Sequence, residues 1–256
     1  MHDTDSEWKK WGKENPYFAV ITDPKYKEGE GKVEFMLSGK KYFEDILQDF
    51  NRLSIPLNRD GNALDYGCGV GRVLKPISEY FKSSTGIDVS SHMLEEARKN
   101  CNKEKTELRL FTEYENLSNL LDNSYSFIHT LIVLQHIPIQ RGLKILEQLL
   151  LKLDFNGRAI IEVPIISTNK LKYNIHNIAT IHPILFKLLR LAKKRDWNSW
   201  KLPIMEMNIY PSSRLIQIFS KTGCEVRWIK LEYTDINKDL ISASWYLSKT
   251  TQLTIE

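Results

Sequence analysis

The 256-residue sequence has no membrane-spanning hydrophobic run, few cysteines and little excess of one charge. It begins with polar and acidic residues instead of a basic and then apolar stretch, so we expect no signal peptide. Cys68, Cys101 and Cys224 are scattered without Cys-x-x-Cys spacing, which argues against a structural disulfide or zinc site. These absences predict a cytoplasmic protein without stable membrane insertion and without a bound metal.

The net charge of +4 is too small for a dedicated nucleic-acid binder, so no nucleic-acid partner is expected. The charge is unevenly distributed. Residues 165–210 contain eight Lys and Arg against two acidic residues, a formal charge of +6. This stretch is too long for a plain loop. A lid with a solvated basic face, a surface for an anionic substrate and a membrane-interface helix all agree with it.

A glycine-rich stretch, A-L-D-Y-G-C-G-V-G-R at 63–72, organises the rest of the chain. A short buried strand, a glycine loop and a helix present backbone N–H groups to a ligand. The Gly-x-Gly-x-Gly spacing differs from the dinucleotide pattern, and Asp65 would repel a pyrophosphate but suits a ligand that carries ammonium and sulfonium charge. A glycine turn without a ligand is the alternative.

A second acid follows at the distance that a nucleotide site requires. Residues 84–88 read as the next strand and end in Asp88. This residue lies about 20 positions beyond the glycine loop, the separation at which a βαβ unit places a carboxylate on ribose hydroxyls. A solvated carboxylate at a strand end is the alternative.

Strands and helices alternate from residue 63 onward, which predicts a doubly wound, mainly parallel α/β sheet. We expect seven strands, the last two forming an antiparallel hairpin at the sheet edge, at about 63–66, 84–88, 107–111, 125–131, 158–163, 225–231 and 240–248.

Three regions follow from this pattern. Residues 1–57 form an N-terminal helical cap, 58–164 and 211–256 form the α/β core, and 165–210 form a basic helical lid inserted into it.

The motifs resemble those of class I S-adenosylmethionine (SAM)-dependent methyltransferases. D-Y-G-C-G-V-G-R and T-G-I-D-V-S are similar to the first two motifs of that family. E-Y-E-N-L and V-L-Q-H-I-P are similar to later segments of its small-molecule, type 11/12-like branch. The resemblance covers roughly 60–164 and, more weakly, the tail from 211. It implies a Rossmann-like methyltransferase fold with SAM as cofactor. No acidic pair follows the fourth strand, which argues against a metal-dependent type.

The resemblance also implies roles for individual residues. Gly67 and Gly69 would lie along the methionine and ribose, and Asp88 would accept from both ribose hydroxyls. Glu113 would approach the adenine amino group, although the family more often has Asp-Ala where this chain has Glu-Tyr, and a surface Glu is the alternative. The full set expected at SAM is Asp65, Gly67, Cys68, Gly69, Gly71, Arg72, Asp88, Val89, Met93, Glu113, Tyr114, Thr130 and Leu131.

Methyl transfer from a sulfonium needs mainly proximity and orientation, but a hydroxyl acceptor also needs a place for its proton. His136, just past the fourth strand, is the predicted base, and a structural histidine is the alternative. His129, inside an apolar strand, is expected to be a core or strand-edge residue. The predicted acceptor pocket consists of Trp11, Tyr17, Phe18, His176, Glu206 and Tyr210; packing of the N-terminal aromatics onto the core is the alternative.

The sequence therefore predicts SAM-dependent methylation of a small-molecule acceptor, with O-methylation of a sugar, a nucleotide-linked sugar or a related metabolite as the specific hypothesis. The basic lid would favour an anionic acceptor, and a homodimer is compatible with the sequence. Two alternatives stay open. One is methylation of a lipid or quinone at a membrane surface, and the other is a non-catalytic SAM-binding regulatory or partner protein.

Overall fold

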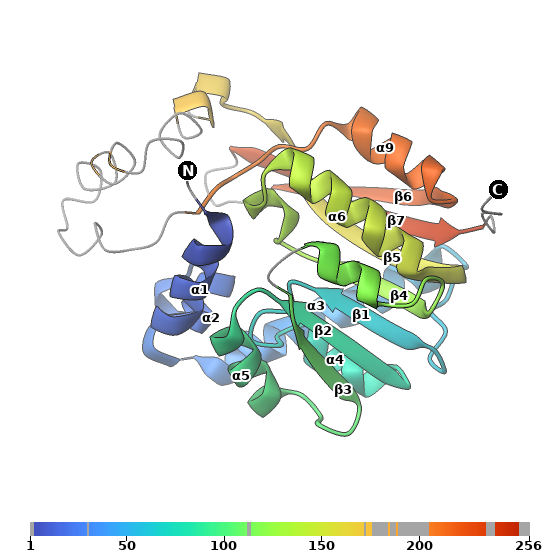
Figure 1. Cartoon of the computed structure of the whole chain (residues 1–256), viewed down its shortest axis with the longest axis horizontal. Helices are drawn as coiled ribbons and strands as arrows, with labels where there is room; N and C mark the ends of the chain where they lie inside the picture. Colours follow the sequence, from blue (N-terminus) through green and yellow to red (C-terminus); the bar gives the residue numbers. More distant parts are fainter. Residues whose placement is uncertain are drawn as a thin grey trace.

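The computed structural model describes residues 3–29, 31–111, 114–171, 173–175, 184, 188, 205–233 and 239–250. Its centre is a seven-stranded sheet in the order β3-β2-β1-β4-β5-β7-β6 (Figure 1). The strands are β1 (Asn62–Tyr66), β2 (Ser83–Asp88), β3 (Thr106–Leu110), β4 (Tyr125–Thr130), β5 (Leu153–Ser167), β6 (Cys224–Tyr233) and β7 (Leu240–Lys249).

The predicted sheet is confirmed. Strands β1 to β5 pair in parallel, and β7 runs antiparallel between β5 and β6. The two closing strands form the expected hairpin, with β6 at the edge. Strand β5 is longer than the predicted 158–163, so the sheet continues into the first residues of the region assigned to the lid.

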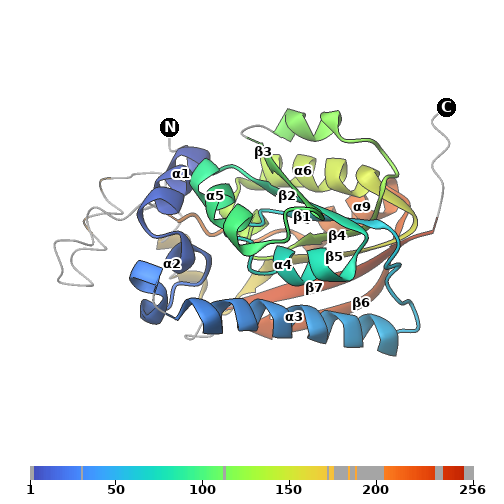
Figure 2. The ribbon, with the colours of Figure 1, turned by 90° about the horizontal axis from the view of Figure 1, so that it is seen from below.

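Helices cover both faces of the sheet. They are α1 (Thr4–Glu14), α2 (Pro16–Val20), α3 (Lys32–Arg52), α4 (Leu74–Tyr80), α5 (Ser91–Asn100), α6 (Ile139–Lys152) and α9 (Ser212–Lys221), with short 3₁₀ turns η1 (Pro24–Gly29), η2 (Tyr114–Asn119) and η3 (Leu134–His136). Helices α3 and α4 lie on one face and α6 and α9 on the other, while α1 and α2 lie at one end of the sheet (Figure 2).

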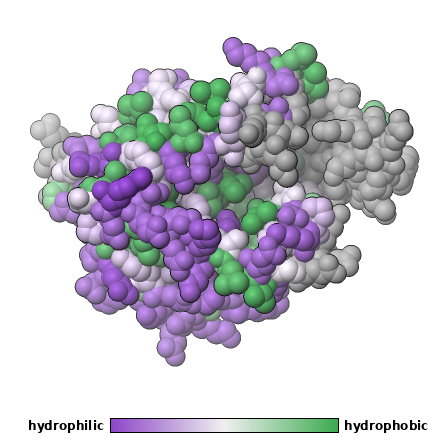
Figure 3. Space-filling view, turned by 180° about the vertical axis from the view of Figure 1, so that it is seen from behind, coloured by the Kyte–Doolittle hydropathy of each residue, from purple (hydrophilic) through white to green (hydrophobic). Residues whose placement is uncertain are grey.

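Strand alternation separates two hydrophobic cores. Ala63, Phe127 and Ile160 point to the α3 face and pack with aromatic residues of α3. Their neighbours Leu64 and Ile128 point to the opposite face and pack with the leucines of α6. The outer surface on the α3 side mixes hydrophilic residues with smaller hydrophobic groups (Figure 3).

The α3 face changes from apolar to polar near the carboxyl ends of the strands. Two positions after Ala63, Phe127 and Ile160 along their strands come Asp65, His129 and Glu162, each less than a tenth exposed. Asp65 and His129 are register partners in the β1–β4 pair. A row of buried polar groups therefore crosses the middle of the sheet under α3.

The N-terminal region packs against two parts of the molecule, the hydrophobic core under the sheet and the α5–glycine loop area. Helix α3 forms part of the core, with Phe43, Ile46 and Phe50 almost completely buried. Helices α1 and α2 instead pack against α5 and the glycine loop, in a cluster that includes Trp11, Phe35 and Met93. The described residues of this region thus form both a cap at the strand ends and one layer of the core.

Most of the predicted basic lid lies outside the described residues. Within it, Ile184 and Leu188 are helical, with exposed fractions of 70% and 50%. The last part of the region, 205–210, returns to the core, where Tyr210 is fully buried.

All three cysteines are free and buried. In the described part of the chain, no helix combines the length and hydrophobicity needed to cross a membrane.

Candidate active site

The glycine loop between β1 and α4 is held by β2. The N–H groups of Gly67 and Cys68 donate to the carbonyl of Ile87, at 2.8 and 2.9 Å. Gly67 and Gly69 have φ angles of +75° and +52°, which side chains rarely adopt. A Cβ at Gly67 would also collide with Val133. These glycines are therefore required by the backbone path itself.

Asp88, the last residue of β2, lies beside this loop. Its Oδ2 accepts from the N–H of Gly69 and its Oδ1 from the N–H of Ser90, both at 2.9 Å. Burial raises the pKa of the Asp88 carboxyl from 3.8 to about 6, while these two hydrogen bonds act in the opposite direction. The carboxylate thus ties the loop to β2 at the edge of a cavity.

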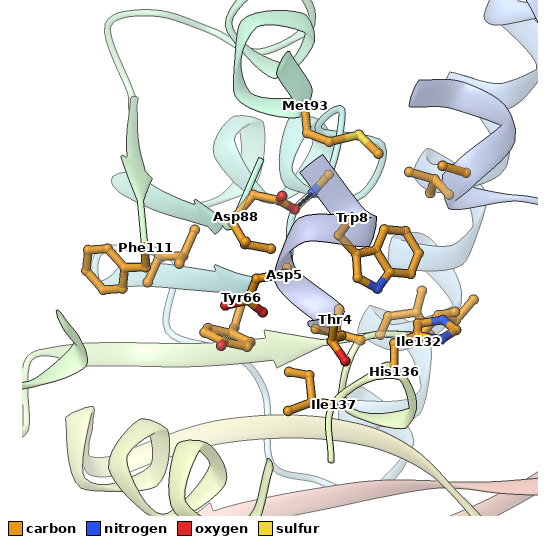
Figure 4. A pocket seen from close by; sticks show the side chains of 18 of the residues that line it. Thr4, Asp5, Trp8, Tyr66, Asp88, Met93, Phe111, Ile132, His136 and Ile137 are labelled. Atoms are coloured by element: carbon orange, nitrogen blue, oxygen red, sulfur yellow. Dashed lines mark hydrogen bonds between the residues drawn. The ribbon is translucent and has the colours of Figure 1, made fainter. Parts of the chain in front are cut away.

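That cavity opens at the carboxyl ends of β1, β2 and β4, where the order of the parallel strands reverses. It is roofed by α1 (Figure 4). Its walls are Thr4, Asp5, Trp8, Ala19, Val20, Tyr66, Gly67, Gly69, Arg72, Ile87, Asp88, Val89, Met93, Phe111, Leu131, Ile132, Val133, His136, Ile137 and Arg141. Eight of these residues belong to the predicted set, namely Gly67, Gly69, Arg72, Asp88, Val89, Met93, Leu131 and His136.

Other predicted cofactor residues lie behind the wall or outside the described residues. Asp65, Cys68, Gly71 and Thr130 are close in sequence to lining residues but do not line the cavity. Glu113 is not among the described residues, and Tyr114 is described through its backbone as the first residue of η2.

Asp65 was expected to face the ammonium group of a ligand, but it does not line the cavity. Its Oδ1 lies 2.7 Å from Nδ1 of His129, and the Nε2 of that histidine lies 3.3 Å from the hydroxyl of Tyr42. Successive strand residues point to opposite faces, so Tyr66 lines the cavity in its place. His129 is 1% exposed, as expected of a core residue.

The aromatic residues predicted for the acceptor pocket, Trp11, Tyr17 and Phe18, are buried and do not line the cavity. Trp11 packs on Phe18, and the Tyr17 hydroxyl donates to Glu96 of α5 at 2.8 Å. They fix α1 and α2 against α5. Trp8, one helical turn before Trp11, is the tryptophan that reaches the cavity. Residues three apart on a helix share a face, so the spacing of Trp8 and Trp11 does not tell which of the two reaches the cavity.

Three contacts hold α1 over the cavity, and we call them the α1 clasp. Arg141 of α6 donates both guanidinium NH2 groups to the Asp5 carboxylate, at 2.8 and 2.7 Å. The Thr4 hydroxyl donates to Glu206 at 2.9 Å. The Trp8 ring lies 4.9 Å from the His136 ring, centroid to centroid. Of the six residues in the α1 clasp, only His136 and Glu206 were expected at the site.

His136, in η3, is held by both ring nitrogens. Nδ1 lies 2.7 Å from the Glu206 carbonyl, so this nitrogen carries the proton and donates. Nε2 then accepts from the Gln135 side-chain amide at 3.3 Å. The ring lines the cavity and is 5% exposed.

Residues 208 and 210 brace the turn that carries His136. The Tyr210 hydroxyl lies 2.8 Å from the Leu134 carbonyl and 3.0 Å from the Ile137 carbonyl. Asn208 donates its side-chain amide to the Ile137 carbonyl at 3.1 Å. Burial raises the pKa of Tyr210. Tyr210 is therefore a support of the site and not a wall of the predicted acceptor pocket; His176 lies outside the described residues.

Ile132 follows β4 with a φ of +59°, an unusual conformation for a β-branched residue. Its N–H donates to Oε2 of Glu162 at 3.0 Å. Burial raises the pKa of Glu162. Ile132 lines the cavity, and no sequence pattern pointed to its strained backbone. Among the described residues, no three His, Cys, Asp or Glu side chains are grouped closely enough to hold a metal ion.

Comparison with known proteins agrees with this geometry. A family model described as a methyltransferase domain matches residues 38–228, most of the chain. No curated protein matches the sequence.

Solved structures share the fold. Magnesium protoporphyrin IX methyltransferase from Synechocystis, solved with bound SAH, aligns with a TM-score of 0.60 at 15% identity, over 96% of this chain and 99% of that one. A SAM-dependent methyltransferase from Anabaena variabilis gives 0.60 at 15% identity, over 97% and 96%. One from Methanosarcina mazei gives 0.56 at 16%, over 77% and 95%. Likeness at this identity shows the fold alone.

Proposed function

This chain belongs to the methyltransferase-domain family and uses SAM, and we propose that it transfers the methyl group to an oxygen of a small-molecule acceptor. The acceptor class that we propose is a sugar, a nucleotide-linked sugar or a related metabolite.

The observation that supports the cofactor part of this proposal is Asp88 beside the glycine loop. Each oxygen of its carboxylate accepts one backbone N–H, and a carboxylate oxygen can accept two hydrogen bonds. Capacity therefore remains for two ribose hydroxyls. Gly67 and Gly69 leave the cavity wall without side chains next to that carboxylate. The residues present thus fit a nucleoside that carries an amino-acid tail.

The cofactor supplies an activated methyl group on a sulfonium, so the protein has to orient two molecules and exclude water. The described walls suit this task. Trp8 and Thr4 of α1 roof the cavity (Figure 4). Leu131, Val133 and Ile137 make the wall beyond β4 apolar. The proposed acceptor would enter at this wall, opposite the ribose end at Asp88.

His136 is the residue that we propose as the proton acceptor. The Glu206 carbonyl fixes the tautomer in which Nε2 has a lone pair. The side-chain amide nitrogen of Gln135 lies 3.3 Å from His136 Nε2 and donates to that lone pair. This is a long hydrogen bond, and an acceptor hydroxyl could replace it. The hydroxyl proton would then move to Nε2 as its oxygen attacks the methyl carbon, and the Glu206 carbonyl would stabilise the imidazolium. The reaction would leave the methyl ether, the neutral thioether and a protonated His136.

The test is incubation of the protein with methyl-labelled SAM and a small-molecule extract, followed by identification of the labelled product. We expect label in a water-soluble metabolite that carries a new methyl ether. The Gly69→Val variant, which should not bind the cofactor, is the background control. Label in the lipid fraction would contradict the proposed acceptor class. Tight SAM binding without transfer to any fraction would contradict catalysis.

A further inference from the structure

Strand β6 forms one edge of the sheet (Figure 1). Its pairing with β7 shifts register between Val226 and Trp228 and is regular from Trp228 to Tyr233. On the outer side of this segment, no other strand of the described residues pairs with it. An uncovered strand edge can pair with a strand of another chain, so the regular segment of β6 is a candidate docking surface.

One face of the β6 segment carries exposed apolar side chains. Ile229 lies opposite Trp245 of β7, which contacts Phe219 of α9. Alternate strand residues share a face, so Ile229, Leu231 and Tyr233 all point to the α9 side. They are 39%, 57% and 54% exposed. A row of three large apolar side chains at a strand edge is typical of a surface that contacts another chain.

The other face of the segment carries one positive and one negative charge. Trp228 lies opposite Tyr246, which belongs to the core under α3, so Lys230 and Glu232 also point to the α3 side. The Lys230 ammonium lies 3.2 Å from the Glu232 carboxylate, and the two side chains are 37% and 58% exposed. An exposed ion pair contributes little to stability, so either charge can bind a different partner at low cost.

This segment is complementary to a second copy of itself. A twofold axis through Leu231, perpendicular to the sheet, makes two copies of β6 antiparallel and keeps each face on the same side. Lys230 of each copy then lies opposite Glu232 of the other, Ile229 lies opposite Tyr233, and Leu231 lies opposite Leu231. Opposite charges and apolar pairs in directly opposed positions stabilise an antiparallel pair of strands.

The two neighbouring registers lack this complementarity. An axis through Lys230 would place two lysines directly opposite each other, and an axis through Glu232 would do the same with two glutamates, which is destabilising. An axis between two residues would oppose side chains from different faces of the sheet. The charges of β6 therefore favour the register centred on Leu231.

We propose that two copies of this chain pair through β6, antiparallel and centred on Leu231, so that one sheet continues across the dimer. Strands β5 and β7 separate β6 from the cavity at the ends of β1, β2 and β4, so each copy keeps its own cavity. The dimer does not depend on the proposed function. Because a single pair of strands buries little area, we expect dissociation in the micromolar range.

The first experiment is sedimentation equilibrium over about 1–200 µM protein. Wild type should show a monomer–dimer equilibrium. Lys230→Glu and Glu232→Lys each place like charges opposite one another twice, so each should raise the dissociation constant about tenfold. The double variant Lys230→Glu/Glu232→Lys restores opposite charges and should return to within about threefold of wild type. A wild type that stays monomeric, or a dimer insensitive to the single reversals, would overturn the proposal.

A matched control makes the same charge change at the other edge of the sheet. Glu107 of β3 is exposed and paired with Arg109, and Glu107→Lys should leave the dimer unchanged. Loss of the dimer in this variant would place the contact at β3 and overturn the proposal. Circular dichroism and the calorimetric affinity for S-adenosylhomocysteine (SAH) should match wild type in every variant. If a single reversal fails to fold, the double variant decides, and its failure to dimerise while folded would overturn the proposal.

Cross-linking measures the register directly. In the Leu231→Cys variant, the two new thiols lie directly opposite, with Cβ atoms about 5 Å apart, so oxidised glutathione should produce a disulfide-linked dimer on a non-reducing gel. In Glu232→Cys the thiols lie on a diagonal of about 7–8 Å, too far for a disulfide. The three native cysteines are buried. Cross-linking of Glu232→Cys but not of Leu231→Cys would contradict the proposed register.

Discussion

The two walls of the cavity are built in different ways. On the β1–β2 side, backbone atoms and one carboxylate form the surface, and its key hydrogen bond joins Gly69 to Asp88 across 19 residues. On the β4 side, side chains from distant segments meet. Arg141 and Asp5 are 136 residues apart, and Thr4 and Glu206 are 202 apart.

This difference separates a rigid half of the site from a half that can open. The loop side is fixed by strand pairing and by glycines in left-handed conformations, so it is set once the sheet has formed. The α1 clasp consists of three side-chain contacts, of which the Arg141–Asp5 pair is partly exposed, and partly exposed contacts open at low free-energy cost. We therefore infer that ligand entry involves the α1 side, and four changes test the contrast.

Removal of the imidazole should have the largest effect. His136→Ala should lower turnover by about 10²–10⁴-fold, the range for loss of a general base, while SAH affinity stays within a few-fold of wild type. The rate of labelled-product formation and the calorimetric SAH affinity measure the two quantities. Equal losses in turnover and in SAH affinity would show that His136 has a structural role, in which it supports Trp8 and Glu206. Gln135→Ala, which removes the present partner of Nε2, is the matched control and should retain most activity.

Gly69→Val should weaken SAH binding by more than about a hundredfold, because a branched side chain at a φ of +52° strains the loop and fills the cavity wall. A Cβ there already lies 3.0 Å from Val20. Gly69→Ala should give a smaller loss. Calorimetry measures the affinity and circular dichroism checks the fold. Normal SAH binding by the valine variant would refute the rigid-wall interpretation.

Asp88→Asn should weaken SAH binding by about ten- to hundredfold, through loss of charged hydrogen bonds to the ribose. The pH dependence is distinctive. Because the folded pKa of Asp88 is raised from 3.8 to about 6, its contribution to the stability of the ligand-free protein is present below about pH 4 and is lost as pH rises through 6.

Ribose hydroxyls donate to the ionised carboxylate, so the SAH affinity of wild type should be constant above pH 6 and fall below it. Calorimetry between pH 5 and 8 measures this. Asp88→Asn should show a flat profile in the same range. A wild-type profile that is equally flat would remove Asp88 from the ribose site.

Opening of the clasp should have the smallest effect. Asp5→Asn and Arg141→Gln should each speed SAH dissociation several-fold, and their double-mutant coupling should be about 1 kcal/mol because the pair is partly exposed. Stopped-flow fluorescence of Trp8, which contacts His136, follows the rate. Lys10→Gln, also on α1 but in an exposed pair with Glu7, is the control. Unchanged dissociation in all variants would show that α1 does not limit exchange.

The same contrast explains what the sequence could predict. The alternation of strands and helices and the spacing from Gly69 to Asp88 are local. They therefore predicted the sheet, which is confirmed, and a carboxylate close to the glycine loop. Asp65 was expected to face the ligand because a carboxylate suits an ammonium group, whereas strand alternation turns it toward His129. Trp8 and Arg141 were missed because no local spacing links α1 to α6. Such pairs become visible after the fold has brought them together.

Glu162 has a consequence for changing the acceptor range of this protein. It does not line the cavity, yet it holds the N–H of Ile132 and so keeps the backbone after β4 in a left-handed turn. The shape of the cavity wall after β4 therefore depends on a carboxylate in the neighbouring strand. Directed evolution that randomises only the lining residues would leave this determinant untouched. A library that varies position 162 together with Ile132 would sample cavity shapes that no exchange of lining side chains can reach.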